Sequence, residues 1–166
     1  MGRTCKLIYV GRNPNDTLVS FYKFSSRAPT WNFTGSFDDF VKYYQKDGLI
    51  FYGRQWDHVL KGLARKEDKN TRFVWFEDMK ADPRTVVEEL SEFLSRPLKQ
   101  NQVTQLCDYL QFDNLKNNKM VSPIAGLALD FNFFRKGEVG DWKNYNLAGM
   151  EEFNLKWEAN RKKNPK

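Results

Sequence analysis

The stretch Lys6-Leu7-Ile8-Tyr9-Val10-Gly11-Arg12-Asn13-Pro14-Asn15-Asp16 decides the fold. Its first five residues form a short apolar run with β-branched and aromatic side chains, which predicts a buried strand. Gly11–Asn15 is a cluster of turn residues. Asp16 can then cap a helix that we expect to run to about Phe24. A strand, a turn and a helix in this order predict the first unit of an α/β layer fold.

A second strand is predicted at Arg72–Phe76, which has the same apolar and aromatic character. Before it, Ser36 and Asp39 form a capping-box pattern at the start of a helix. Val59, Leu60 and Leu63 recur at helical spacing in another. Alternating strands and helices predict a parallel sheet, but two strands make a small one, so the architecture is predicted to be incomplete.

The chain beyond the second strand is predicted to be mostly helical. Val86, Val87 and Leu90 recur at helical spacing and are predicted to face the core. The predicted segments are a loop at Glu77–Ala81, a helix capped by Asp82 with Pro83 at its first position, a helix over 103–110, a long loop over 112–134 and a last helix containing Met150 and Trp157.

The composition is that of an ordinary globular domain. The 166 residues are 40% hydrophobic and 29% charged, with a net charge of +6, so we expect one domain over residues 1–166. Two cysteines, Cys5 and Cys107, make no disulfide framework and are predicted to be buried thiols. No apolar run approaches the length of a membrane span, and no signal peptide is visible, so we expect neither.

Two other classes of protein are disfavoured. Lys and Arg are dispersed along the chain with acids between them, which argues against a nucleic-acid-binding module, although the positive charge keeps that hypothesis in view. A P-loop kinase is disfavoured because the sequence contains no GxxxxGK[ST] motif. We therefore expect no nucleic-acid partner.

The segment Arg135-Lys136-Gly137-Glu138-Val139-Gly140-Asp141-Trp142-Lys143 has the character of an anion clamp. Its glycines allow the backbone to approach a ligand closely, and its adjacent cations favour a phosphate. Asp141 is expected to cap a turn or helix, and Trp142 to anchor the segment.

A second candidate anion site follows the first strand. Arg12 lies just beyond the carboxyl end of that strand, where open α/β sheets bind ligands. Ser20 lies on the helix that follows. The guanidinium and the hydroxyl can both donate to one phosphate, the first through a charge-assisted fork.

Taken together, three motifs closely resemble those of the cytosolic sulfotransferases. They are Arg12-Asn13-Pro14 with Asp16 and Ser20, the run Phe76–Pro83, and the RKGxxGDWK segment, in this order and spacing. The resemblance covers essentially the whole chain. It implies an α/β, P-loop-NTPase-like three-layer fold with a parallel sheet, here incomplete. It also implies a cytoplasmic enzyme that moves a sulfuryl group from 3′-phosphoadenosine-5′-phosphosulfate (PAPS) to a hydroxyl or amine of a small acceptor.

The resemblance assigns ten cofactor-binding residues and no metal site. Those for the 3′-phosphate of PAPS are Arg12, Ser20, Arg135, Lys136 and Gly137. Those near the adenosine are Phe76, Gln111, Phe112, Phe133 and Phe134. Phe76 replaces a family Tyr, which keeps the stacking surface and removes one hydrogen bond, and Gln111 replaces a family Ser. The loop 120–132, with Ile124, Leu127 and Leu129, resembles the family's acceptor lid and suggests a hydrophobic acceptor.

The reacting end of the donor has no counterpart in these 166 residues. The family's phosphosulfate loop, a Lys-Ser-Gly-Thr-Thr-Trp type sequence, and its catalytic His both precede the first predicted strand in the family. The one His here, His58, is not that residue, and we expect a structural or surface role for it. Sulfuryl transfer needs cations at the reacting oxygens and a base for the nucleophile, so we assign no catalytic residue. We expect little or no activity from the isolated chain.

Two further questions stay open at this point. The chain is either part of a sulfotransferase or a non-catalytic relative that binds a nucleotide or a protein partner. A homodimer is weakly supported: the family's Lys-xxx-Thr-Val-xxx-Glu dimerisation motif is matched by Lys143 and Glu152, but Leu147 and Ala148 replace Thr and Val.

Overall fold

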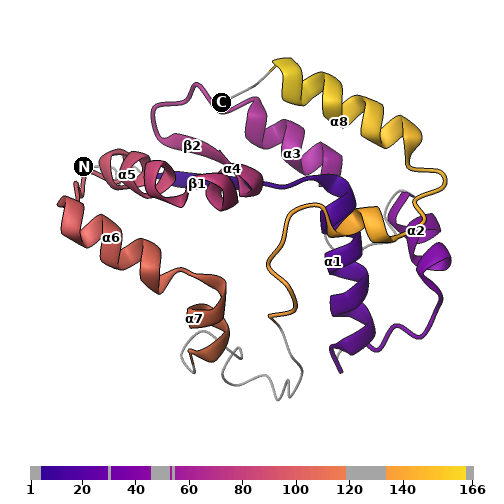
Figure 1. The fold of residues 1–166 in the computed structure, drawn as a ribbon. Helices are drawn as coiled ribbons and strands as arrows, with labels where there is room; N and C mark the ends of the chain where they lie inside the picture. The colour runs from indigo at the N-terminus through magenta and orange to yellow at the C-terminus, as the bar shows by residue number, and fades with distance from the viewer. Residues whose placement is uncertain (1–4, 30, 46–52, 54, 119–133, 164–166) are drawn as a thin grey trace.

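The computed structural model describes residues 5–29, 31–45, 53, 55–118 and 134–163 (Figure 1). The predicted order of strands and helices is confirmed. The elements are β1 (Leu7–Gly11), α1 (Pro14–Arg27), α2 (Phe37–Gln45), α3 (Gln55–Leu63), β2 (Thr71–Trp75), α4 (Phe76–Ala81), α5 (Pro83–Phe93), α6 (Gln100–Tyr109), α7 (Phe112–Asn117), the 3₁₀ helix η1 (Asp141–Asn144) and α8 (Glu151–Lys163).

The two described strands pair in parallel, as predicted. The register joins Leu7 to Thr71 at one end and Gly11 to Trp75 at the other. Side chains alternate between the faces of a strand, so Tyr9, Phe73 and Trp75 share one face. Helices α3 and α8 cover that face, because Trp75 packs with α3 residues Val59 and Leu63 and with α8 residue Trp157 in one buried cluster. On the other face, Arg72 pairs with Glu89 of α5.

A second core cluster lies beside the sheet, where α1, α2 and the start of α8 meet. Its buried members are Leu18, Phe40, Val41, Tyr44 and Met150. The predicted capping box of α2 is confirmed: Ser36 Oγ accepts a hydrogen bond from the Asp39 amide at 3.1 Å, and the Asp39 carboxylate accepts one from the Ser36 amide at 3.3 Å. The N-cap of α5 is confirmed too, because Asp82 accepts a bond from the Thr85 amide at 3.1 Å.

The predicted burial of the first strand is wrong. Leu7, Ile8 and Val10 are 42%, 37% and 50% exposed. Within the described residues β1 has a strand on one side only, so its other edge is uncovered. The two cysteines were predicted to be buried as well, but Cys5 is exposed and Cys107 is half-buried.

Two predicted loops contain short helices. Glu77–Ala81 belongs to α4, and α7 occupies the start of the predicted loop over 112–134. Both helices have acids in the first turn and a Lys in the last, which suits the helix dipole, and neither contains Gly or Pro. The lid predicted at 120–132 lies outside the described residues.

The cap of α1 also differs from the prediction. The side chain of Asn13, not that of Asp16, accepts the amide hydrogen bond of Asn15, at 2.9 Å. Pro14 occupies the first helical position, which its fixed φ favours. The helix therefore begins earlier than predicted, and Asp16 is left inside its first turn with a different function.

Candidate functional site

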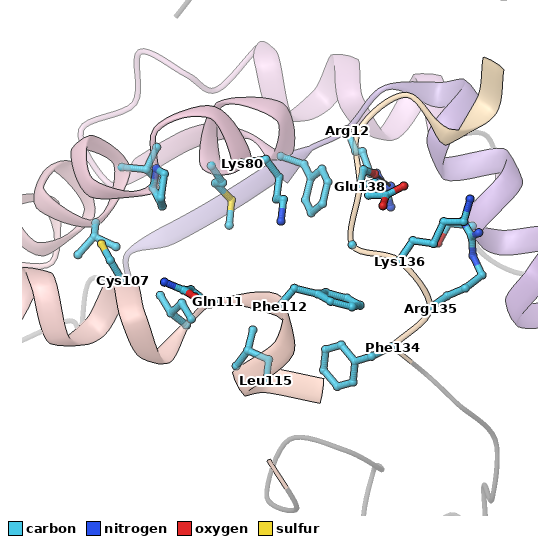
Figure 2. Close-up of a pocket in the computed structure, with 18 of the residues that line it drawn as sticks. Arg12, Lys80, Cys107, Gln111, Phe112, Leu115, Phe134, Arg135, Lys136 and Glu138 are labelled. Atoms are coloured by element: carbon cyan, nitrogen blue, oxygen red, sulfur yellow. Dashed lines mark hydrogen bonds between the residues drawn. The ribbon is translucent and has the colours of Figure 1, made fainter. Parts of the chain in front are cut away.

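A cavity of about 650 Å³ opens at the carboxyl end of β1. Its walls come from the turn after β1, one face of α1, helices α4 to α7 and the segment 134–138 (Figure 2). Nine of the ten predicted cofactor residues line it: Arg12, Ser20, Phe76, Gln111, Phe112, Phe134, Arg135, Lys136 and Gly137. The tenth, Phe133, lies outside the described residues. Segments more than a hundred positions apart in the sequence thus meet at one cavity.

Arg12 is held in the cavity wall with hydrogen-bonding capacity to spare. Its guanidinium lies 4.4 Å from the ring centroid of Phe76, and its Nη2 donates to the carbonyl of Glu138 at 3.2 Å. Its Nε is buried with no hydrogen-bond partner in the described structure. Burial lowers the pKa of Arg12, while the charges of Asp16 and Glu77 act to raise it. A partly desolvated cation of this kind is a strong attractor for an anion.

The turn that carries Arg12 is fixed from several sides. The Asn13 amide donates to Glu77 Oε1 at 2.7 Å, which joins the turn to the first turn of α4. Gln55 Nε2 donates to the Arg12 carbonyl at 3.1 Å. These contacts hold the backbone of Arg12 at the cavity mouth.

Arg135 and Lys136 are arranged around a buried carboxylate. Both pair with Asp141, whose side chain is 4% exposed, and the Lys136 Nζ lies 2.6 Å from Asp141 Oδ1. Burial acts to raise the pKa of Asp141, but the hydrogen bonds from Lys136 and Arg135 outweigh it, so the pKa is lowered. The same bond raises the pKa of Lys136. Asp141 was expected to cap a turn or helix, and instead it orients the two cations.

Gly137 allows the segment to approach the ring of Phe112. Its φ is +66°, and a Cβ at this position would lie 2.1 Å from Phe112 Cδ2. Phe112 also makes an edge contact with Phe134, with ring centroids 6.0 Å apart. Figure 2 shows the Phe112 ring between Gln111 and Leu115 on one side and the segment 134–138 on the other.

Three basic residues in the cavity wall were not predicted from the sequence. They are Lys23 and Arg27 of α1 and Lys80 of α4. The first two lie three and seven positions after Ser20, on the same helix face, so helical spacing could have identified them. Of the residues that the structure describes, six basic side chains and one acidic side chain, Glu138, line the cavity. The cavity is therefore suited to a ligand with more than one negative charge.

The end of the cavity away from the cations is apolar. Val86, Val87 and Leu90 of α5 line it together with Cys107 and Leu110. These α5 residues were predicted to face the core, and they are half-buried in the cavity wall instead. In Figure 2, Cys107 lies far from Arg135 and Lys136, so one cavity has a cationic end and an apolar end.

Other candidate chemistry is limited. His58 is bonded through Nδ1 to the Tyr9 hydroxyl on the α3 side of β1, and is not among the residues lining the cavity, in keeping with the structural role expected for it. Among the described residues, no three His, Cys, Asp or Glu side chains are grouped so that they could hold a metal ion. No helix in the described part of the chain is long and apolar enough to cross a membrane.

The model of the sulfotransferase domain family matches residues 1–154. The chain belongs to the sulfotransferase family. Its similarity to Cytosolic sulfotransferase 5 of Arabidopsis thaliana is 37% identity over 161 residues, covering 90% of this chain and 49% of that protein. It is 33% identical to the 3-beta-hydroxysteroid sulfotransferase of Cavia porcellus, covering 89% of this chain and 53% of that protein. This sulfotransferase chain thus spans about half the length of the relatives it matches.

Solved structures of proteins with related sequences have the same fold. A mouse sulfotransferase complexed with PAP (adenosine 3′,5′-bisphosphate) superposes with a TM-score of 0.79 at 32% identity. The match covers 94% of this chain and 56% of that one. Retinol dehydratase in a complex with retinol and PAP superposes with a TM-score of 0.80 at 30% identity, covering 96% of this chain and 48% of that one. The predicted sulfotransferase fold, mixed α/β with a small parallel sheet, is confirmed at this level.

Proposed function

We propose that this chain binds the nucleotide of PAPS, or its product adenosine 3′,5′-bisphosphate (PAP), in the cavity at the end of β1. The observation that carries the proposal is the meeting of Arg12 and Ser20 with Arg135–Gly137 around one cationic cavity. The 3′-phosphate would lie between these two groups, where the guanidinium of Arg12 and the cations held by Asp141 can both donate to it. The two similar solved structures, both complexes with PAP, support the choice of nucleotide.

The adenosine would lie beside Phe112, with Phe76, Gln111 and Phe134 around it. Aromatic faces suit a base because stacking buries apolar surface without selecting a hydrogen-bond pattern. Phe76 already carries the Arg12 guanidinium on its ring. In this chain Phe76 is therefore proposed to orient the arginine as well as to contact the base.

The reaction proposed for the protein is the family's transfer of a sulfuryl group to a hydroxyl or amine of a small hydrophobic acceptor. The name of one relative includes a hydroxysteroid, and two similar structures contain retinol or androsterone. The 166 residues contain no phosphosulfate loop of the family type. We therefore propose that they supply the half of the site that holds the 3′-phosphate and are inactive alone.

The resemblance to the cytosolic sulfotransferases also supports several finer proposals. The sheet and the helices on its two faces would belong to a P-loop-NTPase-like three-layer architecture. The names of relatives suggest a cytoplasmic location. A homodimer remains a proposal, and Phe133 stays a proposed nucleotide contact.

The alternative is a non-catalytic sulfotransferase relative that binds PAP or a partner. It is compatible with the same observation, because the cationic residues that line the cavity need no reacting group to bind a phosphate. An assay of phenol sulfation by any longer form of this polypeptide separates the two: turnover favours the enzyme, and PAP binding without turnover favours the alternative.

Calorimetric titration of the purified chain tests the nucleotide proposal. We expect PAP to bind and ATP, which lacks a 3′-phosphate, to bind far more weakly. Arg12→Ala and Arg135→Ala should each weaken PAP binding by roughly 10- to 150-fold, the effect of a charge-assisted hydrogen bond of about 1.5–3 kcal/mol. Arg65→Ala, which removes an exposed arginine paired with Asp68, is the control. Unchanged PAP affinity in both cavity variants would refute the site.

A further inference from the structure

Asp16 connects the two halves of the cationic site without lining the cavity. It lies in the first turn of α1 and is 2% exposed. Its Oδ2 accepts a hydrogen bond from the Gly140 amide at 2.7 Å, and its Oδ1 accepts one from the Trp142 amide at 3.2 Å. These partners are 124 and 126 positions away in the sequence. One carboxylate thus joins the turn after β1 to the segment that carries Arg135.

The surroundings of Asp16 are those of a tether, that is, a side chain that links two distant segments of the chain, and not those of a group that binds a ligand. A buried carboxylate is costly unless its oxygens receive hydrogen bonds, and here each oxygen accepts one from a backbone amide. Gly140, whose amide donates one of these bonds, has a φ of +88°. Residues with an L side chain rarely adopt this conformation. The position of Asp16 in the first turn adds a favourable interaction with the helix dipole.

The other connection between the two halves is a single hydrogen bond from a ligand-binding side chain. Within the described structure, three hydrogen bonds join residues 12–16 to residues 134–142: the two to Asp16 and the one from Arg12 to the Glu138 carbonyl. In the proposed function the Arg12 guanidinium also binds the 3′-phosphate, so its donors are shared between the ligand and the Glu138 carbonyl. The two bonds to Asp16 involve no ligand-binding side chain, so they hold the two halves together whether or not a ligand is bound.

We propose that Asp16 is a positioning residue for the 3′-phosphate. It holds the segment 137–142 against the start of α1, and so places Arg135–Gly137 opposite Arg12 at the spacing of one phosphate group. This inference rests on the proposed nucleotide site and deepens it. The predicted consequence is specific: loss of the tether reduces the contribution of the 3′-phosphate and spares that of the rest of the nucleotide.

The experiment compares two ligands that differ by that one group. Binding of PAP and of adenosine 5′-monophosphate (AMP) is measured by calorimetry for the wild-type chain, Asp16→Asn and Asp39→Asn. Asp39 is the matched control, because it is also the third residue of its helix and its replacement changes the net charge equally. We expect Asp16→Asn to lower the ratio of PAP affinity to AMP affinity by roughly tenfold or more, with Asp39→Asn leaving the ratio unchanged.

This ratio separates positioning from loss of folding. A merely destabilised variant has a smaller competent fraction, which lowers both affinities by the same factor and leaves their ratio intact. An unchanged ratio in Asp16→Asn therefore overturns the inference. A wild-type chain that does not prefer PAP over AMP overturns the proposed function instead.

A second measurement does not depend on the folding of Asp16→Asn. Amide hydrogen exchange of Gly140 and Trp142 is followed in the wild-type chain and in Arg12→Ala, which removes the competing connection and keeps Asp16. We expect both amides to stay protected in the variant, because Asp16 holds them. Loss of protection at both amides in Arg12→Ala would show that Arg12 is the tether and would overturn the inference.

Discussion

Gly137 and Gly140 are three positions apart, both have positive φ, and they differ in what surrounds them. A Cβ at Gly137 would lie 2.1 Å from the Phe112 ring, whereas a Cβ at Gly140 would lie no closer than 3.8 Å, from Lys143 Cε. Backbone strain is therefore common to both positions, and steric conflict with the proposed adenosine site belongs to Gly137 alone.

Replacing each glycine with alanine separates these two effects. Both variants should lose about 1–2 kcal/mol of unfolding free energy from the left-handed backbone conformation. Gly137→Ala should also displace the Phe112 ring, so its PAP affinity should fall further than that of Gly140→Ala. Denaturant unfolding and calorimetry measure the two quantities. Equal PAP affinities in the two variants would contradict the contact between Gly137 and Phe112.

The ion pairs of Asp141 should make stability depend on pH. The pKa of Asp141 is lowered in the folded chain, so its stabilising contribution is complete above the unfolded carboxyl pKa of about 3.9. That contribution is lost as pH falls through the lower, folded value. Asp141→Asn should cost about 1–3 kcal/mol of unfolding free energy at pH 7, and the difference from wild type should shrink below about pH 4.

Urea unfolding between pH 3 and pH 7 checks this dependence. Asp38→Asn is the control, because Asp38 is an exposed acid with no ion pair in the described structure. A difference between wild type and Asp141→Asn that stays constant across this range would show that the carboxylate charge does not stabilise the segment.

At the scale of elements, α3 packs on β1 through a glycine. A Cβ at Gly62 would lie 2.8 Å from three atoms of the Tyr9 ring, which stacks on Phe73 with centroids 5.0 Å apart. The ring cannot move away freely, because it is stacked on Phe73 and its hydroxyl is bonded to His58. The close approach of helix and strand therefore requires a residue with no side chain at position 62.

Gly62→Ala should destabilise the protein although alanine is the better helix former. The gain in helix propensity is about 1 kcal/mol, and overpacking against a fixed ring costs about 1–3 kcal/mol. With Tyr9→Ala already present the conflict is absent, so the same substitution should become stabilising by about 1 kcal/mol. A double-mutant cycle by urea unfolding measures the change of sign. Stabilisation by Gly62→Ala in the wild-type background would contradict the packing.

The elements that the sequence predicted well are those with strong local signals. The apolar run at Lys6–Val10, the capping box at Ser36 and the Asp82-Pro83 start all depend on neighbours in the sequence. The short helices α4 and α7 were missed because six residues carry little periodicity. The exposure of Leu7 and Val10 was missed because burial depends on which elements lie alongside a strand.

In the candidate site, too, features with a local sequence signal were predicted and features that depend on distant partners were not. The motifs at Arg12 and Arg135 were recognised from their own residue types. The functions of Asp16 and Asp141 were not, because each depends on partners brought together by the fold: amides 124 and 126 positions away for Asp16, and two cations for Asp141. A carboxylate looks alike in a sequence whether it caps a helix or tethers a distant segment.

At the scale of the whole molecule, the cavity lies between parts of the chain that share few other contacts. Its walls come from residues 12–27, from helices α4 to α7 and from the segment 134–138. The six cations in these walls repel one another when no anion is present. A ligand with several negative charges should relieve that repulsion and hold the three parts together.

PAP should therefore raise the melting temperature of the whole chain. At a concentration one hundred times its Kd, binding adds about 2.7 kcal/mol, and a domain of this size gains roughly 2–4 °C per kcal/mol, so a rise of roughly 5–10 °C is expected. The rise should shrink with added salt, because salt screens the exposed part of the attraction, and it should be smaller in Arg135→Ala at the same PAP concentration. Differential scanning calorimetry measures it, with AMP as the comparison ligand. A melting temperature that a high concentration of PAP leaves unchanged would mean that the nucleotide does not bind the folded chain, because a ligand that binds only the folded chain must stabilise it.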